Sequence, residues 1–399
     1  MTKISNIITK IFLTLLILSP APIYFATTYH DLTNDSTQKQ PWTSFFSNPN
    51  ESVYISWETE EENMGKIKYG LDPTDLDLET AYEPSPTKIH HISLSGLTAN
   101  TTYYYKVESE GFNSEIRSFV TAPNGPSQFS WTMYSDSQQP VIAPGHHKEL
   151  ANEIQKKHSS GKEFRFSAIV GDLVEAGNRK YLWDNFFDSA SAYTDQIPIV
   201  PVVGNHDRID RYNTYFNEYF INSENTTNKQ FYWSFDYGHV HFSCLSFTYA
   251  RDWEFTEEHI NWIINDLEQA QDSTFRIVMF HSPIIGAGFF SGNENLLGLN
   301  IDLDVNMTQI FLDYNVTATI HGHEHHYERG SIQDMKYFIL GGGGGAFDPG
   351  LNPQPQTEFL TMTPSYTEVD AKANSLIFKT YTLDGNLLDQ DTIYAEGEN

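Results

Sequence analysis

The sequence predicts two domains in series, an all-β sandwich over residues 42–124 and an α/β domain over residues 125–395. The length of 399 residues is typical of two domains rather than one. From Trp42 to Asn124 the chain shows short alternating runs separated by Gly, Pro and Asn clusters, which is typical of a sandwich. After the breaker-rich segment "TAPNGPSQ" (121–128) the rhythm changes to strands that alternate with helices.

The runs that predict strands of the sandwich are "SVYISW", "GKIKYG", "KIHHISL", "TTYYYKV" and "EIRSFVT". In "GLTANTTYYYKV", Leu97 and a turn precede Tyr103 near the start of a strand. This arrangement resembles the tyrosine corner of fibronectin type III domains, in which the hydroxyl bonds back to the loop. We interpret His90 and His91, on one of these strands, as surface residues and not as metal ligands.

The second domain opens with the predicted strand "QFSWTMYSD" and the helix "GHHKELANEIQKKH". A clear amphipathic helix, "TEEHINWIINDLEQA", places Ile260, Ile263, Ile264 and Leu267 on one face. The remaining elements follow in the order "FRFSAIVGD" (strand), "RKYLWDNFFDSASAY" (helix), "IPIVPVVGNHD" (strand), "FRIVMFHSP" (strand), "VNMTQIFLDY" (helix) and "VTATIHGHEHH" (strand). This alternation predicts helices packed against a buried sheet.

The N-terminus predicts export. Lys3 and Lys10 precede a short apolar run, residues 11–18, and Pro20 and Pro22 then interrupt it. We interpret residues 1–26 as a signal peptide or an uncleaved membrane anchor, with a buried N-terminal helix as the alternative, and residues 27–41 as a linker. The protein is therefore expected to be secreted or extracytoplasmic, either free or held at the membrane by an uncleaved anchor.

The charge and the cysteine content limit the partners. A formal charge of −28 should repel nucleic acid and anionic membrane surfaces, so an anionic substrate must be attracted locally. Cys244 is the only cysteine, which excludes an intrachain disulfide, and its strand-like context predicts a small buried side chain.

Five predicted strands end on side chains that can bind metal. Open α/β sheets bind ligands at the carboxyl ends of their strands, so a shared site explains the five endings better than five unrelated turns. These side chains are Asp136, Asp172, the group Asn205, His206 and Asp207, then His281, and finally His323 with His325.

The ligand types favour two metal ions. Two carboxylates, three imidazoles and an amide oxygen exceed what one tetrahedral ion needs. A mixed oxygen and nitrogen set suits iron, manganese or zinc rather than calcium. Two such ions about 3.5–4 Å apart can clamp both sides of a phosphoryl transfer.

The ordered motifs "SDSQ", "GDLVEAG", "GNHD", "FHSP" and "GHEHHYER" resemble those of the calcineurin-like metallophosphoesterases. With a sandwich in front and the Gly-rich "YFILGGGGGAFD" behind, the chain is most similar to the purple acid phosphatase branch. The resemblance implies a two-sheet α-β-β-α sandwich for the catalytic domain. It also implies Asp172 as the carboxylate that bridges the metals, Asp136 and His325 on the first metal, Asn205, His281 and His323 on the second, and His206 as a catalytic group that faces the phosphate without binding metal.

The chain departs from the purple enzymes at two positions. Glu175 replaces the tyrosine that stabilises ferric iron and gives the colour, and it either ligates the first metal or lies beside it. Gln138 stands where many metallophosphoesterases have a histidine ligand, which predicts a weaker first metal site. The substrate-loop histidines of the family are also not evident in "SPIIGAGFFSGNENLLG".

Several neighbouring residues receive secondary roles. We expect His321 to be packed or to support the ligands, His326 to be solvated or to line the cleft, and Arg329 to brace the loop. Gly322 is expected to permit the turn between the two histidine ligands. Asp207 either orients the His206 imidazole or is a turn residue.

These observations predict a metal-dependent phosphoric ester hydrolase that acts on a small phosphorylated substrate. The favoured reaction is hydrolysis of phosphate monoesters by attack of a metal-bound hydroxide, with His206 stabilising the transition state and protonating the leaving group. A phosphodiesterase, acting for example on cyclic nucleotides, uses the same metal core and stays open. A non-catalytic surface-binding protein with a decayed site is the third reading, and the presence of all six predicted ligands argues against it.

Overall fold

The computed structural model describes residues 39–139, 145–209, 214–220, 232–246, 257–288, 307–348 and 350–395. The predicted signal or anchor and residues 27–38 of the predicted linker lie outside these ranges. None of the helices within them is both long enough and apolar enough to cross a bilayer.

The N-terminal domain is a β-sandwich whose two layers share one apolar core. Val53, Ile55 and Trp57 from one layer pack with Ile67 and Tyr105 from the other. Its strands are β2 (Ser52–Asn63), β3 (Lys66–Gly70), β4 (Leu78–Glu79), β5 (Thr87–Ser95), β6 (Thr102–Ser109), β7 (Phe112–Asn113) and β8 (Arg117–Val120). The backbone N–H of Thr98 donates to the Tyr103 hydroxyl over 2.9 Å, so the tyrosine bonds back to the loop as the sequence predicts.

One layer of this sandwich continues into the second domain. The nine-stranded sheet has the order β21-β20-β19-β9-β10-β11-β1-β2-β5. Here β1 (Lys39–Ser44) pairs antiparallel with β2 and parallel with β11. The other strands of this sheet are β9 (Phe129–Tyr134), β10 (Phe164–Val170), β11 (Ile199–Val202), β19 (Ser365–Lys372), β20 (Ser375–Thr382) and β21 (Leu387–Tyr394). The sheet therefore crosses the predicted domain boundary.

The strand β1 begins at Lys39, inside the segment that the sequence predicts as linker. Its polar start is misleading, because the Lys39 ammonium is buried in an ion pair with Glu58 and another with Asp184 of the second domain. Trp42, also on β1, is fully buried and packs against Phe187, with ring centroids 4.4 Å apart. Polarity alone does not separate a linker from a strand whose charge finds a buried partner.

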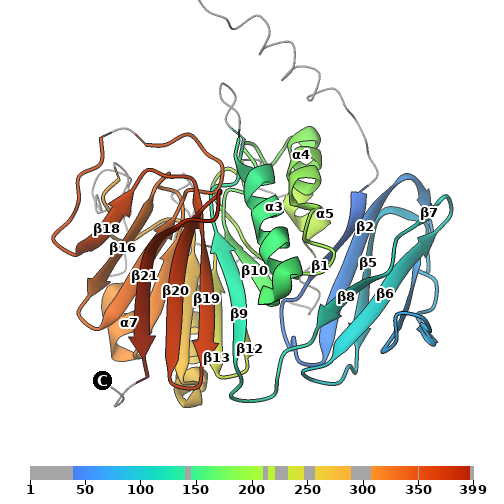
Figure 1. The fold of residues 1–399 in the computed structure, drawn as a ribbon, viewed down its shortest axis with the longest axis horizontal. Helices are drawn as coiled ribbons and strands as arrows, with labels where there is room; N and C mark the ends of the chain where they lie inside the picture. The colour runs from blue at the N-terminus through green and yellow to red at the C-terminus, as the bar shows by residue number, and fades with distance from the viewer. Residues whose placement is uncertain are drawn as a thin grey trace, which may run out of the picture. The chain divides into compact units, whose positions relative to one another are not determined.

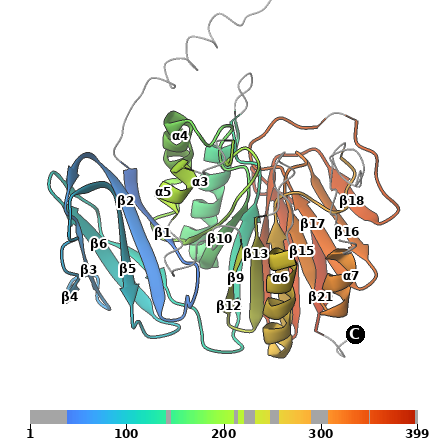
Figure 2. The ribbon, with the colours of Figure 1, turned by 180° about the vertical axis from the view of Figure 1, so that it is seen from behind.

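The second sheet packs against the first, and helices cover the two outer faces, so the predicted α-β-β-α arrangement is confirmed (Figures 1 and 2). The second sheet has the order β12-β13-β14-β15-β17-β16-β18. Its strands are β12 (Tyr232–Tyr237), β13 (Val240–Leu245), β14 (Phe275–Phe280), β15 (Ala318–His321), β16 (Tyr327–Ile332), β17 (Met335–Leu340) and β18 (Thr357–Thr361).

The helices lie close to their predicted ranges. On the first sheet are α3 (His147–Lys157), which continues into a π-helical turn η1 (His158–Lys162), α4 (Lys180–Ala190) and α5 (Thr214–Tyr219). On the second are α6 (Glu257–Gln269), followed by a 3-10 turn η2 (Ala270–Asp272), and α7 (Met307–Asp313). The buried residues of α6 include Ile260, Ile263 and Leu267, which lie on the face that the sequence periodicity predicts.

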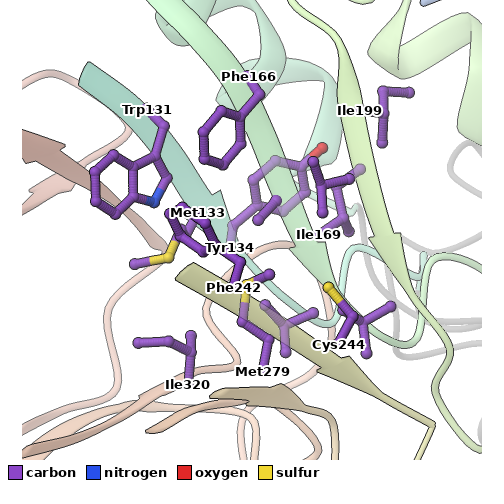
Figure 3. Close-up of a cluster of buried hydrophobic side chains, with 14 of the residues drawn as sticks. Trp131, Met133, Tyr134, Phe166, Ile169, Ile199, Phe242, Cys244, Met279 and Ile320 are labelled. Atoms are coloured by element: carbon purple, nitrogen blue, oxygen red, sulfur yellow. The ribbon is translucent and has the colours of Figure 1, made fainter. Parts of the chain in front are cut away.

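Large apolar side chains fill the space between the two sheets (Figure 3). Trp131 and Phe166 from the first sheet meet Phe242 from the second, with ring centroids 5.4 Å from Phe242 in both pairs. Cys244 belongs to this core and is buried, as predicted, and burial raises the pKa of its thiol. This packing fixes the carboxyl ends of the strands of both sheets against each other.

The expectation that His90 lies on the surface is wrong. His90 is fully buried, its ring stacks on Trp57 at 4.5 Å, and its Nδ1 lies 2.5 Å from a Glu83 carboxylate oxygen. His91 is half-buried, and its Nε2 lies 2.8 Å from the carbonyl oxygen of Glu218 on α5. Strand alternation alone does not reveal which face of a strand a second layer covers.

Candidate metal centre

The two sheets deliver all six predicted ligands to one edge. Strands β9, β10 and β11 run parallel in the first sheet, and β14 and β15 run parallel in the second, so their carboxyl ends point the same way within each sheet. Asp136, Asp172 and Asn205 follow the first three strands, while His281 follows β14 and His323 and His325 follow β15. The residues that the sequence places far apart are therefore neighbours in space.

Three of these residues have an unusual backbone. Asp136, Asp172 and His323 have φ angles of 58°, 52° and 69°, in the left-handed region that non-glycine residues rarely occupy. Such conformations cost on the order of 1–3 kcal/mol each, and they cluster at functional sites. The strain points each side chain away from its strand and toward the common edge.

Gly322 is needed because its backbone lies close to Ser135, and not because the turn requires a left-handed residue at this position. The left-handed residue of the turn is His323, while a Cβ at Gly322 would stand 1.8 Å from Ser135 Oγ. Similarly, a Cβ at Gly204 would stand 2.1 Å from Asp172 Oδ1. Glycine at both positions lets the ligand-bearing loops come together.

Asp172 lies at the middle of the group. Its Oδ2 is 3.1 Å from His281 Nε2, and its Oδ1 accepts a hydrogen bond of 2.9 Å from the backbone N–H of His206. One ligand atom each from Asp172, His281 and His323 lie within 4.8 Å of one another. The Asn205 Oδ1 completes this side at 2.8 Å from His323 Nδ1.

Asp136 and His325 form the other side. Asp136 Oδ1 lies 3.4 Å from His325 Nε2 and 3.9 Å from His281 Nε2. Asp136 Oδ2 accepts the backbone N–H of His323 over 2.9 Å, while its Oδ1 is buried and has no hydrogen-bond partner among the described residues. A buried carboxylate oxygen without a donor is costly, and a cation at this place satisfies it.

Backbone carbonyls orient two of the imidazoles. Nδ1–H of His281 donates to the carbonyl of Val170 over 2.8 Å, and Nδ1–H of His325 donates to that of Ala346 over 2.6 Å. In both rings the proton on Nδ1 leaves Nε2 to face the carboxylates. This is the arrangement by which proteins present histidine to a metal, so the residues fit a metal centre.

The carboxylates and imidazoles of the group lie close enough to shift one another's pKa values. Burial alone lowers the pKa of a histidine, but the Asp172 and Asp136 carboxylates raise the pKa of His281 to about 9. For His325, burial is likewise outweighed by Asp136, and the pKa rises to about 10. Burial raises the pKa of a carboxyl, yet His281 and the other imidazoles hold the pKa of Asp172 well below its usual range. A cation that replaces these protons meets ionised carboxylates.

His206 lies beside the ligands and is partly open to solvent. Its Nδ1–H donates to the carbonyl of Glu175 over 2.7 Å, and its Nε2 is 4.0 Å from Asp172 Oδ2. Burial works against protonation, but the charge of Asp172 and the bond to Glu175 raise the pKa of His206. Because Nδ1 is held by the Glu175 carbonyl, Nε2 is the ring nitrogen that faces the site, and the neighbouring charges favour the form of the ring that carries a proton there.

Asp207 does not orient this ring. Its Oδ1 accepts the backbone N–H groups of Leu173 and Val174 at 2.9 and 3.2 Å, and its Oδ2 accepts that of Gly204 at 2.8 Å. Burial and then the charge of Asp172 raise the pKa of Asp207 to about 7. Asp207 therefore connects the loop after β10 to the loop after β11. The Glu175 carbonyl, rather than Asp207, orients the His206 ring.

Glu175 and Gln138, the two positions at which the sequence departs from the purple enzymes, lie close to the site. The Glu175 carboxylate is partly exposed, with one oxygen 3.9 Å from His206 Nδ1, and it does not join a three-residue group of ligand atoms among the described residues. The Gln138 amide fits best with its nitrogen donating to the carbonyls of Asp136 (3.1 Å) and Asp172 (2.9 Å), which leaves its oxygen 3.2 Å from His325 Nε2. A neutral amide oxygen thus stands where the resemblance to the family predicts a histidine ligand.

The other residues of the histidine-rich segment have structural contacts. His321 is buried with Nδ1 3.1 Å from the Phe280 carbonyl and Nε2 2.9 Å from the Thr319 hydroxyl, so both nitrogens are engaged away from the site. His326 is fully buried, which corrects the expectation that it is solvated or lines the cleft. Arg329 is a brace, but it joins strands rather than the loop: Nε and Nη2 bond the two Asp389 oxygens of β21 at 2.7 and 3.1 Å.

Comparisons with known proteins agree with this architecture. Residues 129–327 match the model of the calcineurin-like phosphoesterase family, and residues 39–121 match that of the purple acid phosphatase N-terminal domain. Purple acid phosphatase 22 of Arabidopsis thaliana is 25% identical over 333 residues, which cover 78% of this chain and 70% of that protein.

Two solved structures show the same fold. The purple acid phosphatase PPD1 from yellow lupin seeds (Lupinus luteus) superposes with a TM-score of 0.71 at 16% identity, over 89% of this chain and 74% of that one. The structure of PhoD superposes with a TM-score of 0.68 at 12% identity, over 91% and 94% of the two chains. The chain therefore belongs to the calcineurin-like phosphoesterases, with a purple acid phosphatase-type N-terminal domain, and is a metal-dependent phosphoric ester hydrolase.

Proposed function

We propose that the chain hydrolyses phosphate monoesters at a centre for two metal ions. Asp172 is the shared ligand, Asp136 and His325 complete the first position, and Asn205, His281 and His323 complete the second. The single observation that carries this proposal is the place of Asp172, whose carboxylate lies 3.1 Å from one imidazole and within reach of ligands from both sheets. Bound iron, zinc or manganese would supply an activated water and neutralise the phosphoryl oxygens.

The protein residues determine where the substrate lies. The His206 side chain is 33% exposed, compared with 18% for His325, so the phosphate is placed on the His206 side of the ligands. A phosphate there meets Nε2 of His206, because Nδ1–H is held by the Glu175 carbonyl, and its negative charge favours the protonated ring. His206 then stabilises the extra negative charge of the transition state and passes its proton to the leaving oxygen.

The test compares two chromogenic esters on one preparation. Metal-depleted protein is assayed with an aryl phosphate monoester and an aryl phosphate diester before and after addition of Mn²⁺, Zn²⁺ or Fe²⁺. We expect activity to return with metal and the monoester to be turned over faster. No turnover of either ester with any metal, although two metals bind, would contradict the proposal and favour a binding protein.

Glu175 supports a second candidate, a phosphodiesterase. Its partly exposed carboxylate has an oxygen 3.9 Å from His206 Nδ1, so a substrate held by His206 would meet its negative charge. A diester carries one negative charge and a monoester at neutral pH nearly two, so this charge disfavours the monoester more. A higher kcat/KM for the diester, reversed by Glu175→Gln, would select this candidate.

We also infer that the protein is exported. Support comes from the basic start, the apolar run over residues 11–18 and the two prolines that follow. Cell fractionation with an antibody decides it, and recovery of full-length protein from the cytosol alone would exclude an N-terminal signal.

A further inference from the structure

The His206 ring depends on the loop after a neighbouring strand for its orientation. Its Nδ1–H donates to the backbone carbonyl of Glu175 over 2.7 Å, and Glu175 lies in the segment between β10 and α4. A carbonyl on a loop orients a ring only as well as the loop itself is held. The residues that fix this segment therefore determine the direction in which His206 Nε2 points.

Gly177 joins this segment to the loop that carries His206. Its N–H donates to the carbonyl of His206 over 2.8 Å, in the direction opposite to the bond from the His206 ring to Glu175. The two backbones are so close that a Cβ at Gly177 would stand 1.8 Å from the carbonyl oxygen of Asp207. Two hydrogen bonds and one close approach therefore connect the two loops at the same place.

Trp183 on α4 holds Gly177 from the other side. Its indole N–H donates to the Gly177 carbonyl over 2.9 Å, and its side chain is fully buried. The ring packs against Phe186 of the same helix and against Tyr219 of α5, with ring centroids 6.1 and 5.7 Å away. Because packing fixes the indole, Gly177 is bound in a defined position through both its N–H and its carbonyl.

The first two turns of α4 are themselves fixed by β1 and β2. Asp184 Oδ1 pairs with Lys39 Nζ of β1 at 2.5 Å, and Lys180 Nζ lies 3.1 Å from Glu58 Oε1 of β2. Lys39 and Glu58 are buried. Separating such a pair leaves an uncompensated buried charge, so α4 cannot shift along these strands without a large cost. The helix therefore gives Trp183 a rigid support.

We propose that Trp183 is a positioning residue for His206, an inference that rests on the proposed function of His206 as proton donor. The indole N–H holds the Gly177 carbonyl, the Gly177 N–H holds the His206 carbonyl, and the Glu175 carbonyl then orients the imidazole so that Nε2 faces the substrate. Trp183 acts through these hydrogen bonds and not by contact with the substrate. A small misplacement of a reacting group by a distant change can cost on the order of 10²-fold in rate.

The test compares Trp183→Phe with Trp131→Phe. Both changes replace a fully buried indole by a smaller ring, but Trp131 Nε1 has no hydrogen-bond partner among the described residues, so only the first change removes a hydrogen bond. We expect kcat to fall by about 10–100-fold in Trp183→Phe, with the wild-type KM and metal content. The loss should be larger for an alkyl phosphate than for an aryl phosphate, since the poorer leaving group needs its proton more. Equal kcat values in the two variants would overturn the proposal.

A double-mutant cycle shows whether Trp183 acts through His206. In the His206→Ala background, Trp183→Phe should change the rate by less than about twofold, because residues that act as a unit are not additive. The full loss in that background would mean that Trp183 supports the fold or the metals instead, and would overturn the proposal. A His206→Ala protein that keeps the wild-type rate would contradict the proposed function itself, which a failure at Trp183 alone would not.

A measurement that needs neither turnover nor metal follows the Nδ1 proton of His206. In metal-free protein labelled with ¹⁵N-histidine, the hydrogen bond to Glu175 should protect this proton from exchange with water, and the signal is assigned by its loss in His206→Ala. We expect the wild-type exchange rate in Trp131→Phe. Exchange should be about tenfold faster in Trp183→Phe and in Gly177→Ala, whose added Cβ forces the loops apart. Unchanged exchange in both loop variants would overturn the proposal, whichever ester the protein hydrolyses.

Discussion

The two sides of the proposed catalytic centre are built differently. On the His281 side, one ligand atom each from Asp172, His281 and His323 already lie within 4.8 Å of one another, with Asn205 in contact. On the Asp136 side, only Asp136 and His325 approach, and the two remaining family positions hold the amide of Gln138 and the carboxylate of Glu175. The difference teaches that one side is preorganised for its metal, whereas the other offers weaker donors and should exchange its metal more readily.

The largest effect is expected where the two sides meet. Asp172→Ala removes the only carboxylate proposed to belong to both, so both metals should be lost or scrambled and activity should fall by more than about 10³-fold. Metal content and turnover are measured together on the purified variant. Near-normal turnover with two metals per chain would falsify the binuclear reading.

His206 lies outside both sides, and its loss should leave them intact. His206→Ala should keep the metal content of the wild type and lose about 10²–10⁴-fold in rate, the usual worth of one general acid. His321→Asn serves as a control that should change neither quantity. A His206 variant that sheds a metal would place this residue among the ligands.

Metal binding on both sides should depend on pH. Without metal, His281 has a pKa of about 9 and His325 one of about 10, because carboxylates outweigh burial in both cases. A metal must displace each proton, so below these values affinity should fall by up to about tenfold per pH unit for each proton displaced. Titrations of metal-free protein between pH 6 and 8 should show proton release, and affinities independent of pH would contradict it.

Gln138 offers a way to make the two sides alike. Gln138→His places an imidazole where the amide oxygen now stands, and it should tighten the weaker metal by about 10–100-fold. Competition with a chelator measures the change. A Gln138→Asn variant, with a shorter amide, is the matched control and should weaken the same metal; equal affinities in all three proteins would mean that position 138 lies outside the site.

A change at Glu175 is expected to have the smallest effect on rate but a clear effect on the visible absorption spectrum. The wild type loaded with iron should lack an intense visible band, since a carboxylate gives no phenolate-to-iron charge transfer, and Glu175→Tyr should gain it. Absorption spectra of the two iron-loaded proteins decide this. A purple band in the wild type would mean that another tyrosine has reached the metal.

The strand endings were predictable because a parallel sheet sends every carboxyl end to one edge. That rule placed the six predicted ligands together and did so across two sheets, and the helices followed from apolar periodicity. What could not be predicted depends on contacts between distant residues. His326 was predicted to be exposed, because local sequence does not reveal its partner Glu328 or the strands that cover both residues. Asp207 was considered as a partner of the His206 ring, but its oxygens accept backbone N–H groups from two loops instead.

The C-terminal strands show the same limit. Strands β19, β20 and β21 complete one edge of the first sheet, and Arg329 bonds Asp389 of β21, yet the local sequence predicts no elements in this region. Hydrogen bonding between segments more than two hundred residues apart, such as β9 with β19, determines where such strands pair. Local alternation contains no information about that partner.

The sheet that runs from β5 to β21 has a consequence for how the chain can be divided. Removing the N-terminal domain at residue 124 would uncover the edge of β11 and the aromatic surface that Trp42 covers. An exposed strand edge beside apolar surface invites pairing with another chain. The catalytic domain is thus not an independent module, and it should aggregate when it is expressed alone. A chimera in which the N-terminal domain is replaced would have to keep β1 paired with β11 for the hydrolase to stay soluble.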